Sequence, residues 1–117
     1  MNRVDIPLKL PSLNDYIDAC RGNRYKGAKM KKEYENAIAI FVARLPQFKG
    51  AIRIHFQWFE KNERRDPDNV AFAKKFILDT LVKLKKIPND NHKYIRSFTD
   101  SFIYGEEQKV RIYIIDE

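Results

Sequence analysis

The sequence has little cysteine and no long apolar run. Its one cysteine, Cys20, excludes an internal disulfide framework and a cysteine-rich zinc site. Cys20 falls on the apolar face of a predicted helix, so we expect a buried thiol rather than a nucleophile. No apolar stretch approaches the roughly 18 residues of a membrane span, and the N-terminus lacks the long apolar core of a signal peptide. We therefore expect a cytoplasmic protein with no membrane contact.

The chain does contain enough apolar material for one core, together with an excess of positive charge. Of its 117 residues 44% are hydrophobic, which is sufficient for one small domain. No repeat, low-complexity tract or linker divides the chain, so we predict a single domain over residues 1–117. Lys and Arg number 23 against 16 Asp and Glu, a net charge of +7. Such a domain favours polyanionic partners such as nucleic acid, although basic charge can also serve solubility alone.

Hydrophobic periodicity predicts a mixed α/β (α+β) fold with about four strands in one mixed sheet and about three helices. The first helix is expected to begin after Ser12, with Asp15 in a capping-box position. The last two strands are joined through residues 105–108 and are expected to form a hairpin. The predicted strands cover residues 3–9, 50–59, 94–104 and 109–115, and the predicted helices cover residues 12–22, 30–45 and 67–86.

A group of acids begins the third predicted helix. The run Arg64-Arg65-Asp66-Pro67-Asp68-Asn69 is followed, just past the end of the helix, by Asp90. Hard divalent cations need several oxygen ligands, which Asp66, Asp68 and Asp90 could supply together with Asn69 if the fold gathers them. Arg64 and Arg65 indicate that a phosphate approaches. The pattern favours a metal-dependent cut in a nucleic-acid backbone.

The same acids have a purely structural interpretation. Asp66 can be a helix N-cap, Pro67 the favoured first helical residue, and Asp68 a first-turn acid that suits the helix dipole. Asp90 can be a turn residue. A helix of about 18 residues would also span about 27 Å, so Asp90 reaches Asp66 only if the chain runs back or the helix ends early. Spacing alone leaves both interpretations open.

Basic residues are densest between positions 21 and 32. They can contact phosphates, since Lys and Arg dominate nucleic-acid affinity, or they can simply be a solvated helix start. If they bind DNA, they should position it without reading bases. With the two arginines beside the acids, the candidate phosphate contacts are Arg21, Arg24, Lys29, Lys31, Lys32, Arg64 and Arg65.

An ordered set of motifs resembles the RusA family of Holliday junction resolvases, in particular its branch in phages and prophages of Gram-positive bacteria. The set is Arg65-Asp66-Pro67-Asp68-Asn69, then Lys75 and Leu78-Asp79-Thr80-Leu81, then Asn89-Asp90. The segments 11–16, 23–25 and 27–32 are also similar, so the likeness covers nearly the whole chain.

The resemblance implies a homodimeric α/β endonuclease, without an organic cofactor, that uses Mg²⁺ or Mn²⁺ to nick paired strands of a four-way DNA junction. Such an enzyme serves DNA recombination and repair or the processing of branched phage DNA. Asp66, Asp68 and Asp90 match the family's metal-binding carboxylates, and Lys75 matches its functional lysine.

Two positions depart from the family's pattern. Asn89 stands where the family has the first residue of an Asp-Asp pair, so Asn89, like Asn69, would support the carboxylates rather than bind the metal as an anion. The lysine also lies further from Asp68 than usual, so Lys74 is an alternative to Lys75. Lys75 is preferred because it lies seven residues after Asp68, two turns along on the same helix face.

Two other functions suit the same residues. One is a non-catalytic, basic nucleic-acid-binding module in which the aspartates serve only as caps. The other is a metal nuclease that cuts flaps or another branched DNA. The binding module predicts no Mg²⁺ effect beyond salt screening, whereas the flap nuclease predicts a different ranking of substrates.

Overall fold

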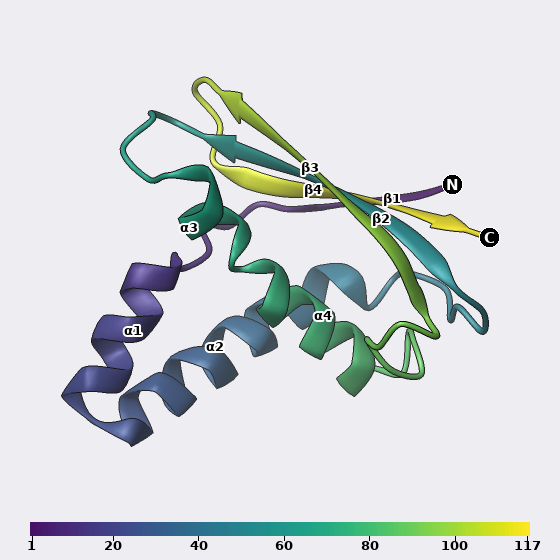
Figure 1. Ribbon diagram of the computed structural model, residues 1–117, viewed down its shortest axis with the longest axis horizontal. Coiled ribbons are helices and arrows are strands. Elements are labelled where there is room, and N and C mark those ends of the chain that lie inside the picture. Colours follow the sequence, from purple (N-terminus) through teal and green to yellow (C-terminus); the bar gives the residue numbers. More distant parts are fainter.

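Four strands form one mixed sheet in the computed structural model, which describes residues 1–117. The sheet order is β1-β4-β2-β3, and only β2 and β3 run parallel to each other (Figure 1). The predicted four-stranded mixed sheet is therefore confirmed. The strands are β1 (Asn2–Ile6), β2 (Ile52–Glu60), β3 (Ile95–Tyr104) and β4 (Lys109–Asp116).

The predicted hairpin between the last two strands is wrong. β4 pairs with β1 on one side and with β2 on the other, so β2 separates β3 from β4. The short connection instead crosses the end of β2, where the Gly105 N–H donates to the Glu60 carbonyl oxygen at 2.9 Å. The alternating apolar residues Val110, Ile112 and Ile114 are all buried. A central place in the sheet lets β4 bond through both of its edges while it contributes to the core.

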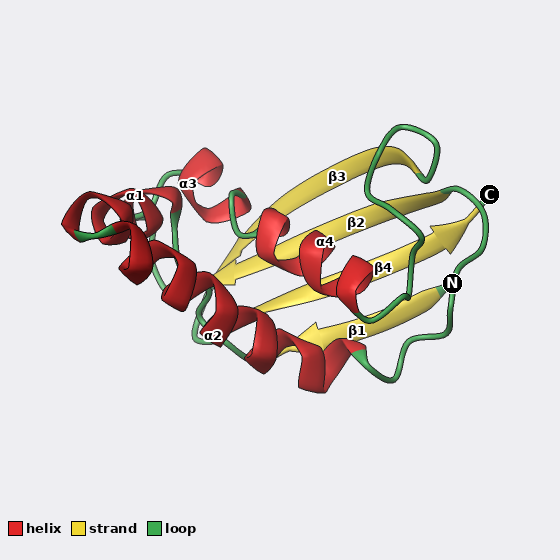
Figure 2. Cartoon of the chain, turned by 90° about the horizontal axis from the view of Figure 1, so that it is seen from below, coloured by secondary structure: helices red, strands yellow, loops and turns green.

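The helices cover one face of the sheet (Figure 2). They are α1 (Leu13–Gly22), α2 (Arg24–Val42), the short α3 (Pro67–Ala71) and α4 (Lys74–Lys83). The predicted capping box is present, since the Asp15 N–H donates to Ser12 Oγ at 3.1 Å and the Ser12 N–H donates to Asp15 Oδ2 at 2.9 Å. None of the helices has the length and apolar character needed to cross a bilayer.

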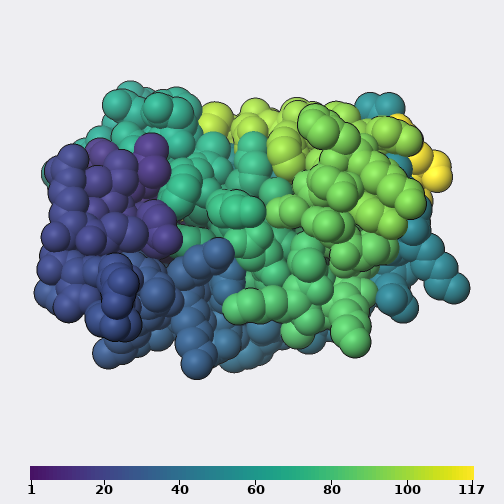
Figure 3. Space-filling view, turned by 60° about the horizontal axis from the view of Figure 1, so that its bottom comes forward, coloured from purple at the N-terminus to yellow at the C-terminus, as the bar shows by residue number.

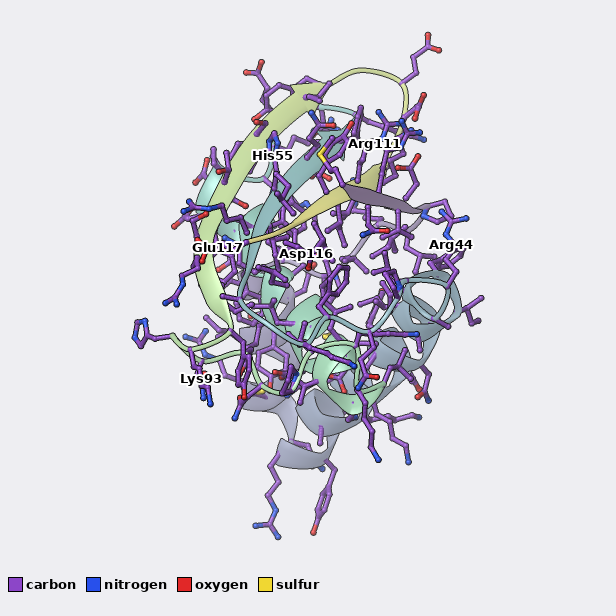
Figure 4. All side chains as sticks on the ribbon, turned by 90° about the vertical axis from the view of Figure 1, so that its right-hand side faces the viewer. Arg44, His55, Lys93, Arg111, Asp116 and Glu117 are labelled. Atoms are coloured by element: carbon purple, nitrogen blue, oxygen red, sulfur yellow. The ribbon has the colours of Figure 1, made fainter.

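Polar contacts organise the face of the sheet that the helices leave open. His55 and Arg111 lie on this face (Figure 4). The His55 Nε2 atom is 2.8 Å from Ser101 Oγ, and its ring lies 5.9 Å from the Tyr113 ring. Arg111 Nε donates to Asp5 Oδ1 at 2.8 Å. The opposite face carries the alternating apolar side chains of the strands and forms the core against the helices.

The single helix predicted over residues 67–86 is broken into α3 and α4. Phe72 and Ala73 keep helical backbone angles, but the Ala73 N–H bonds to the Val70 carbonyl and the Lys75 N–H to the Phe72 carbonyl, both in the tighter i→i−3 pattern. No Pro or Gly marks this break, and the apolar residues keep helical spacing across it, so the sequence pattern predicts one continuous helix. The second part ends at Lys83, and Lys85 has a φ of 59°, which closes the helix with a left-handed residue.

Cys20 is exposed, which contradicts the predicted burial. It lies where α1 and α2 approach closely, and a Cβ added at Gly27 would collide with the Cys20 sulfur. The apolar face of α1 is therefore used for contact with α2 rather than for complete burial, and no residue of α1 is fully buried.

Candidate active site

Asp66 and Asp68 carry carboxylates that no basic side chain neutralises. Asp66 occupies the N-cap position of α3 but makes no side-chain cap hydrogen bond. Asp68 Oδ1 accepts from the Asn69 N–H at 3.0 Å. Both aspartates are exposed, and neither takes part in any of the ion pairs of the structure. The Asp66 carboxylate is thus not used as the helix cap that its position allows.

Arg65, in contrast, is held inside the protein. Its Nε and Nη2 donate to the two carboxylate oxygens of Glu60 at 2.8 and 2.9 Å, and its Nη1 donates to the Leu10 carbonyl oxygen at 2.9 Å. Glu60 is buried and also accepts from Gln108 Nε2 at 2.7 Å. The Arg65 guanidinium therefore joins three parts of the chain, and this structural role competes with the phosphate contact predicted for it. Arg64 is exposed and forms no ion pair.

The two candidate lysines differ sharply in their surroundings. Lys74 Nζ donates to Asp100 Oδ2 at 2.8 Å and lies 4.5 Å from the centre of the Phe98 ring. The same carboxylate accepts from Trp58 Nε1 at 2.8 Å. Lys74 therefore fastens the start of α4 to the sheet. Lys75 keeps 56% of its side chain exposed, so it is the more accessible of the two lysines.

The connection after α4 brings one of the predicted acids into contact with the predicted lysine. Asp90 lies in the connection between α4 and β3, yet its Oδ2 is 3.5 Å from Lys75 Nζ at the start of α4. Its N–H donates to Asn89 Oδ1 at 2.7 Å. Asn89 therefore shapes the turn that presents Asp90, and its expected support of the metal-binding carboxylates stays a prediction.

A hollow of about 380 Å³ lies between α3 and the start of α4, next to Lys75. Asp68 lines it from α3, and Lys74 and Lys75 line it from α4, around the apolar side chains of Phe72 and Leu78. Lys75 is the link between the segments, since it shares this hollow with Asp68 and contacts Asp90. No contact joins Asp66 to the group, although it lies only two residues before Asp68.

Two further acids, Asp79 and Glu35, pair with lysines in this part of the surface. Asp79 Oδ1 is 3.0 Å from Lys75 Nζ, and Asp79 Oδ2 is 2.7 Å from Lys31 Nζ. Glu35 is buried on α2 and accepts from Lys83 Nζ at 2.6 Å, while its Oε2 has no hydrogen-bond partner. A second hollow of about 430 Å³ has charged side chains around it: Lys31, Glu35, Asp79, Lys83 and Asp90.

Hydrogen bonding sets the pKa values in this arrangement. The hydrogen bond to Asp79 raises the pKa of Lys75 and also that of Lys31, against the opposing effect of burial. Burial raises the pKa of Asp79, but the hydrogen bonds from both lysines outweigh it, so the net pKa is lowered. All three groups therefore stay charged at neutral pH.

Sequence reasoning gave no role to Asp79 or Glu35. Asp79 was detectable, because it lies four residues after Lys75, the spacing of an ion pair on one helix face. Glu35 lies beside the apolar stripe of α2, and an acid in that position is a signal of a buried, paired group.

The other predicted phosphate contacts fall into two kinds. Lys31 is turned toward Asp79, so its predicted phosphate contact is replaced by an intramolecular one. Lys29 is exposed, and its Nζ is 3.9 Å from Glu33 Oε1. The remaining three are exposed and form no ion pair: Arg21, Arg24 and Lys32.

The expected divalent cation can be tested against these residues. In donor chemistry they fit, because Asp66 and Asp68 offer unneutralised carboxylate oxygens, which hard cations prefer. The Asp90 carboxylate is held by a long contact that an ion could replace. Their carboxylates are too far apart to share an ion as they stand, because the structure has no group of three or more His, Cys, Asp or Glu side chains placed to hold one metal ion. A shared ion would have to draw the carboxylates together.

Comparison of the sequence with protein-family models gives no match, and a search of curated proteins also gives none. What this site does is therefore inferred from its own residues and their contacts.

Proposed function

We propose that this protein is a metal-dependent endonuclease that resolves four-way DNA junctions, acting in the bacterial cytoplasm as a RusA-type resolvase. One observation carries the proposal. Lys75 lines a hollow with Asp68 and contacts Asp90, so a cation and two acids of the predicted set share one surface although they are far apart in sequence. Exposed acids can bind a metal ion, and a neighbouring lysine can offset negative charge on a phosphodiester while it is cleaved.

The residues divide the work according to their surroundings. Asp66, Asp68 and Asp90 would hold the divalent ion, which would supply an activated water and charge neutralisation at the leaving oxygen. Lys75 stays protonated because its hydrogen bond to Asp79 raises its pKa. Its flexible, half-exposed ammonium group can turn from Asp90 to the phosphoryl oxygens, where it offsets developing negative charge. Asp79 positions Lys75 for this role.

Exposed basic residues are proposed to hold the DNA. Arg64 lies beside the acids without an ion pair, and Arg21, Arg24 and Lys32 lie unpaired on α1 and α2. Lys29 makes only a long contact. Phosphate contacts of this kind position a duplex without reading its sequence. A four-way junction has two equivalent strands to cut, so a two-fold homodimer would match its symmetry.

The test is cleavage of a labelled four-way junction beside a linear duplex and a flap, each with Mg²⁺ and with EDTA. The proposal predicts paired, symmetric nicks in the junction that require Mg²⁺ and little cutting of the controls. Junction binding without nicks under any metal would leave a nucleic-acid-binding module. Preferred cutting of the flap would replace the resolvase by another structure-selective nuclease.

A further inference from the structure

The turn between α1 and α2 projects from the molecule at the end opposite to both termini (Figure 1). We call residues 21–29 the α1–α2 tip. The two helices are joined by one residue, Asn23, whose Oδ1 accepts from the Tyr25 N–H at 2.8 Å. Gly27 lets the helices approach, because a Cβ there would collide with the Cys20 sulfur. The tip is thus a short, internally braced structure rather than a loose loop.

Tyr25 is presented to solvent by this tip. Its exposure is 66%, far above that of a tyrosine used in the core. The guanidinium carbon of Arg24 lies 5.0 Å from the centre of the Tyr25 ring, and Arg24 Nη2 is 3.1 Å from the Tyr25 hydroxyl. The arginine therefore fixes the ring and leaves a flat aromatic surface available. Exposed aromatic rings beside arginine are suited to stacking on nucleobases.

The charge around Tyr25 is of one sign. Residues 21–32 include six basic residues and no acid. Lys31 is neutralised by Asp79 and Lys29 approaches Glu33, but Arg21, Arg24, Lys26 and Lys32 form no ion pair. In Figure 3 the N-terminal helices, purple to blue, gather at one end of the molecule. A polyanionic strand would be attracted to this end before any base is contacted.

The tip also leads toward the candidate active site. Ala28 and Lys32, which follow Tyr25 on α2, line the same hollow of about 430 Å³ as Asp90. Tyr25 lies seven residues before Lys32, about 10 Å along the helix at 1.5 Å per residue. A nucleic-acid strand lying along this part of α2 could reach both the aromatic ring and the hollow.

We propose that the α1–α2 tip is a stacking site for unpaired nucleobases, with Tyr25 as the stacking ring and the surrounding lysines and arginines as phosphate contacts. The choice of DNA as the ligand rests on the proposed function. Stacking itself does not require cleavage, because Tyr25 and Arg24 make no contact with Asp66, Asp68 or Asp90. The tip would hold bases that branching or strand separation has left unpaired near the cut.

The experiment measures binding in EDTA, so that no cleavage occurs. Labelled oligo-dT of about 16 nucleotides is compared with an abasic strand of equal length, oligo-U and a blunt duplex. Tyr25→Leu should weaken oligo-dT binding roughly 5- to 100-fold, the range for one stacked base, and should leave abasic binding unchanged. Oligo-U, the RNA arm, should respond to Tyr25→Leu in the same way, because stacking uses only the base. Tyr104→Leu, which removes another exposed tyrosine outside the tip, should not change oligo-dT binding.

A second variant gives a direct signal of stacking. Tyr25→Trp places an indole at the exposed position, while the natural Trp58 is only 1% exposed and remains a constant background. Oligo-dT should quench the new fluorescence and the abasic strand should not. Wild-type oligo-dT binding by Tyr25→Leu, or equal binding of abasic and oligo-dT strands by the wild type, would overturn the stacking site. Stacking with no junction cleavage would instead overturn only the nuclease proposal.

Discussion

The charged residues from Glu60 to Lys75 fall into two regions. In one, which we call the anchored region, they are held by partners inside the protein; in the other, the open region, they are exposed to solvent. In the anchored region, Glu60 binds Arg65 and Asp100 binds both Lys74 and Trp58, all with donor–acceptor distances below 3 Å. These groups are largely withdrawn from water, with exposed fractions of 7% for Glu60 and 18% for Arg65. They fasten the segment that follows β2 to the sheet.

The open region lies next to the anchored region in sequence but differs from it in exposure and in ionic partners. Arg64, Asp66 and Asp68 are exposed and have no ionic partner. Lys75 pairs with Asp79 at 3.0 Å and contacts Asp90 at 3.5 Å, yet 56% of its side chain remains exposed. Adjacent residues therefore fall on opposite sides of this division: Arg64 beside Arg65, and Lys75 beside Lys74. The comparison teaches that residue type and spacing do not separate a structural charge from an available one. What separates them is burial together with an intramolecular partner, as the exposed fractions of 19% for Lys74 and 56% for Lys75 show.

The largest expected effect comes from breaking the anchored region. Arg65→Met leaves the Glu60 carboxylate buried without its cation, and removal of one partner of a buried ion pair costs about 3–5 kcal/mol. We expect the free energy of unfolding, measured by urea titration, to fall by that amount. Arg64→Met should change it by less than about 0.5 kcal/mol, as is usual for an exposed surface site. Equal losses for the two variants would remove the distinction.

The second effect separates the adjacent lysines by activity rather than stability. Lys75→Met should slow single-turnover junction cleavage by roughly 10²–10³-fold, the cost of losing one group that stabilises transition-state charge. Its stability should change by less than about 1 kcal/mol, because exposed ion pairs contribute little. Lys74→Met should instead lower the free energy of unfolding by about 1–2 kcal/mol. At temperatures where this variant is folded, its cleavage rate should be near that of the wild type. A cleavage defect confined to Lys74→Met would assign the functional lysine to the other position.

The smallest effect is a pH dependence at the border of the two regions. Hydrogen bonds from Lys31 and Lys75 lower the pKa of Asp79 in spite of its burial. Its contribution to stability is therefore fully present above the unfolded pKa of about 3.9 and is lost as the pH falls through the lower folded value. Asp79→Asn should be less stable than the wild type at pH 6, and the difference should shrink below pH 4. Asp18→Asn, an exposed acid without an ion pair, should show no such trend.

Much of the fold was predictable because its signals are local. The alternation of β2 places Ile52, Ile54, Phe56 and Trp58 in the core, as the sequence pattern indicates. The capping box at Ser12 is a short-range hydrogen-bond pattern and forms as predicted. The hairpin failed because strand order depends on long-range pairing, which a four-residue connection does not determine.

The sequence motifs proposed the members of the candidate site, whereas the contacts of these residues depend on the fold. The structure places Lys75 in one hollow with Asp68 and in contact with Asp90, which lies in the connection after α4. The break between α3 and α4 has no Pro or Gly signal. The inward turn of Arg65 depends on Glu60 and Leu10, which are distant partners that no local pattern reveals.

The most direct test of the central claim is junction cleavage by Asp68→Asn under single-turnover conditions with saturating protein and Mg²⁺. The matched control is Asp116→Asn, an exposed aspartate at the C-terminal end of β4, which lies at the other end of the sheet from α3 (Figure 1). We expect Asp68→Asn to bind the junction at least as tightly as the wild type, because a negative charge facing phosphates is lost, and to make no nicks. Asp116→Asn should nick normally. Wild-type nicking by Asp68→Asn would show that the open region is not the active site.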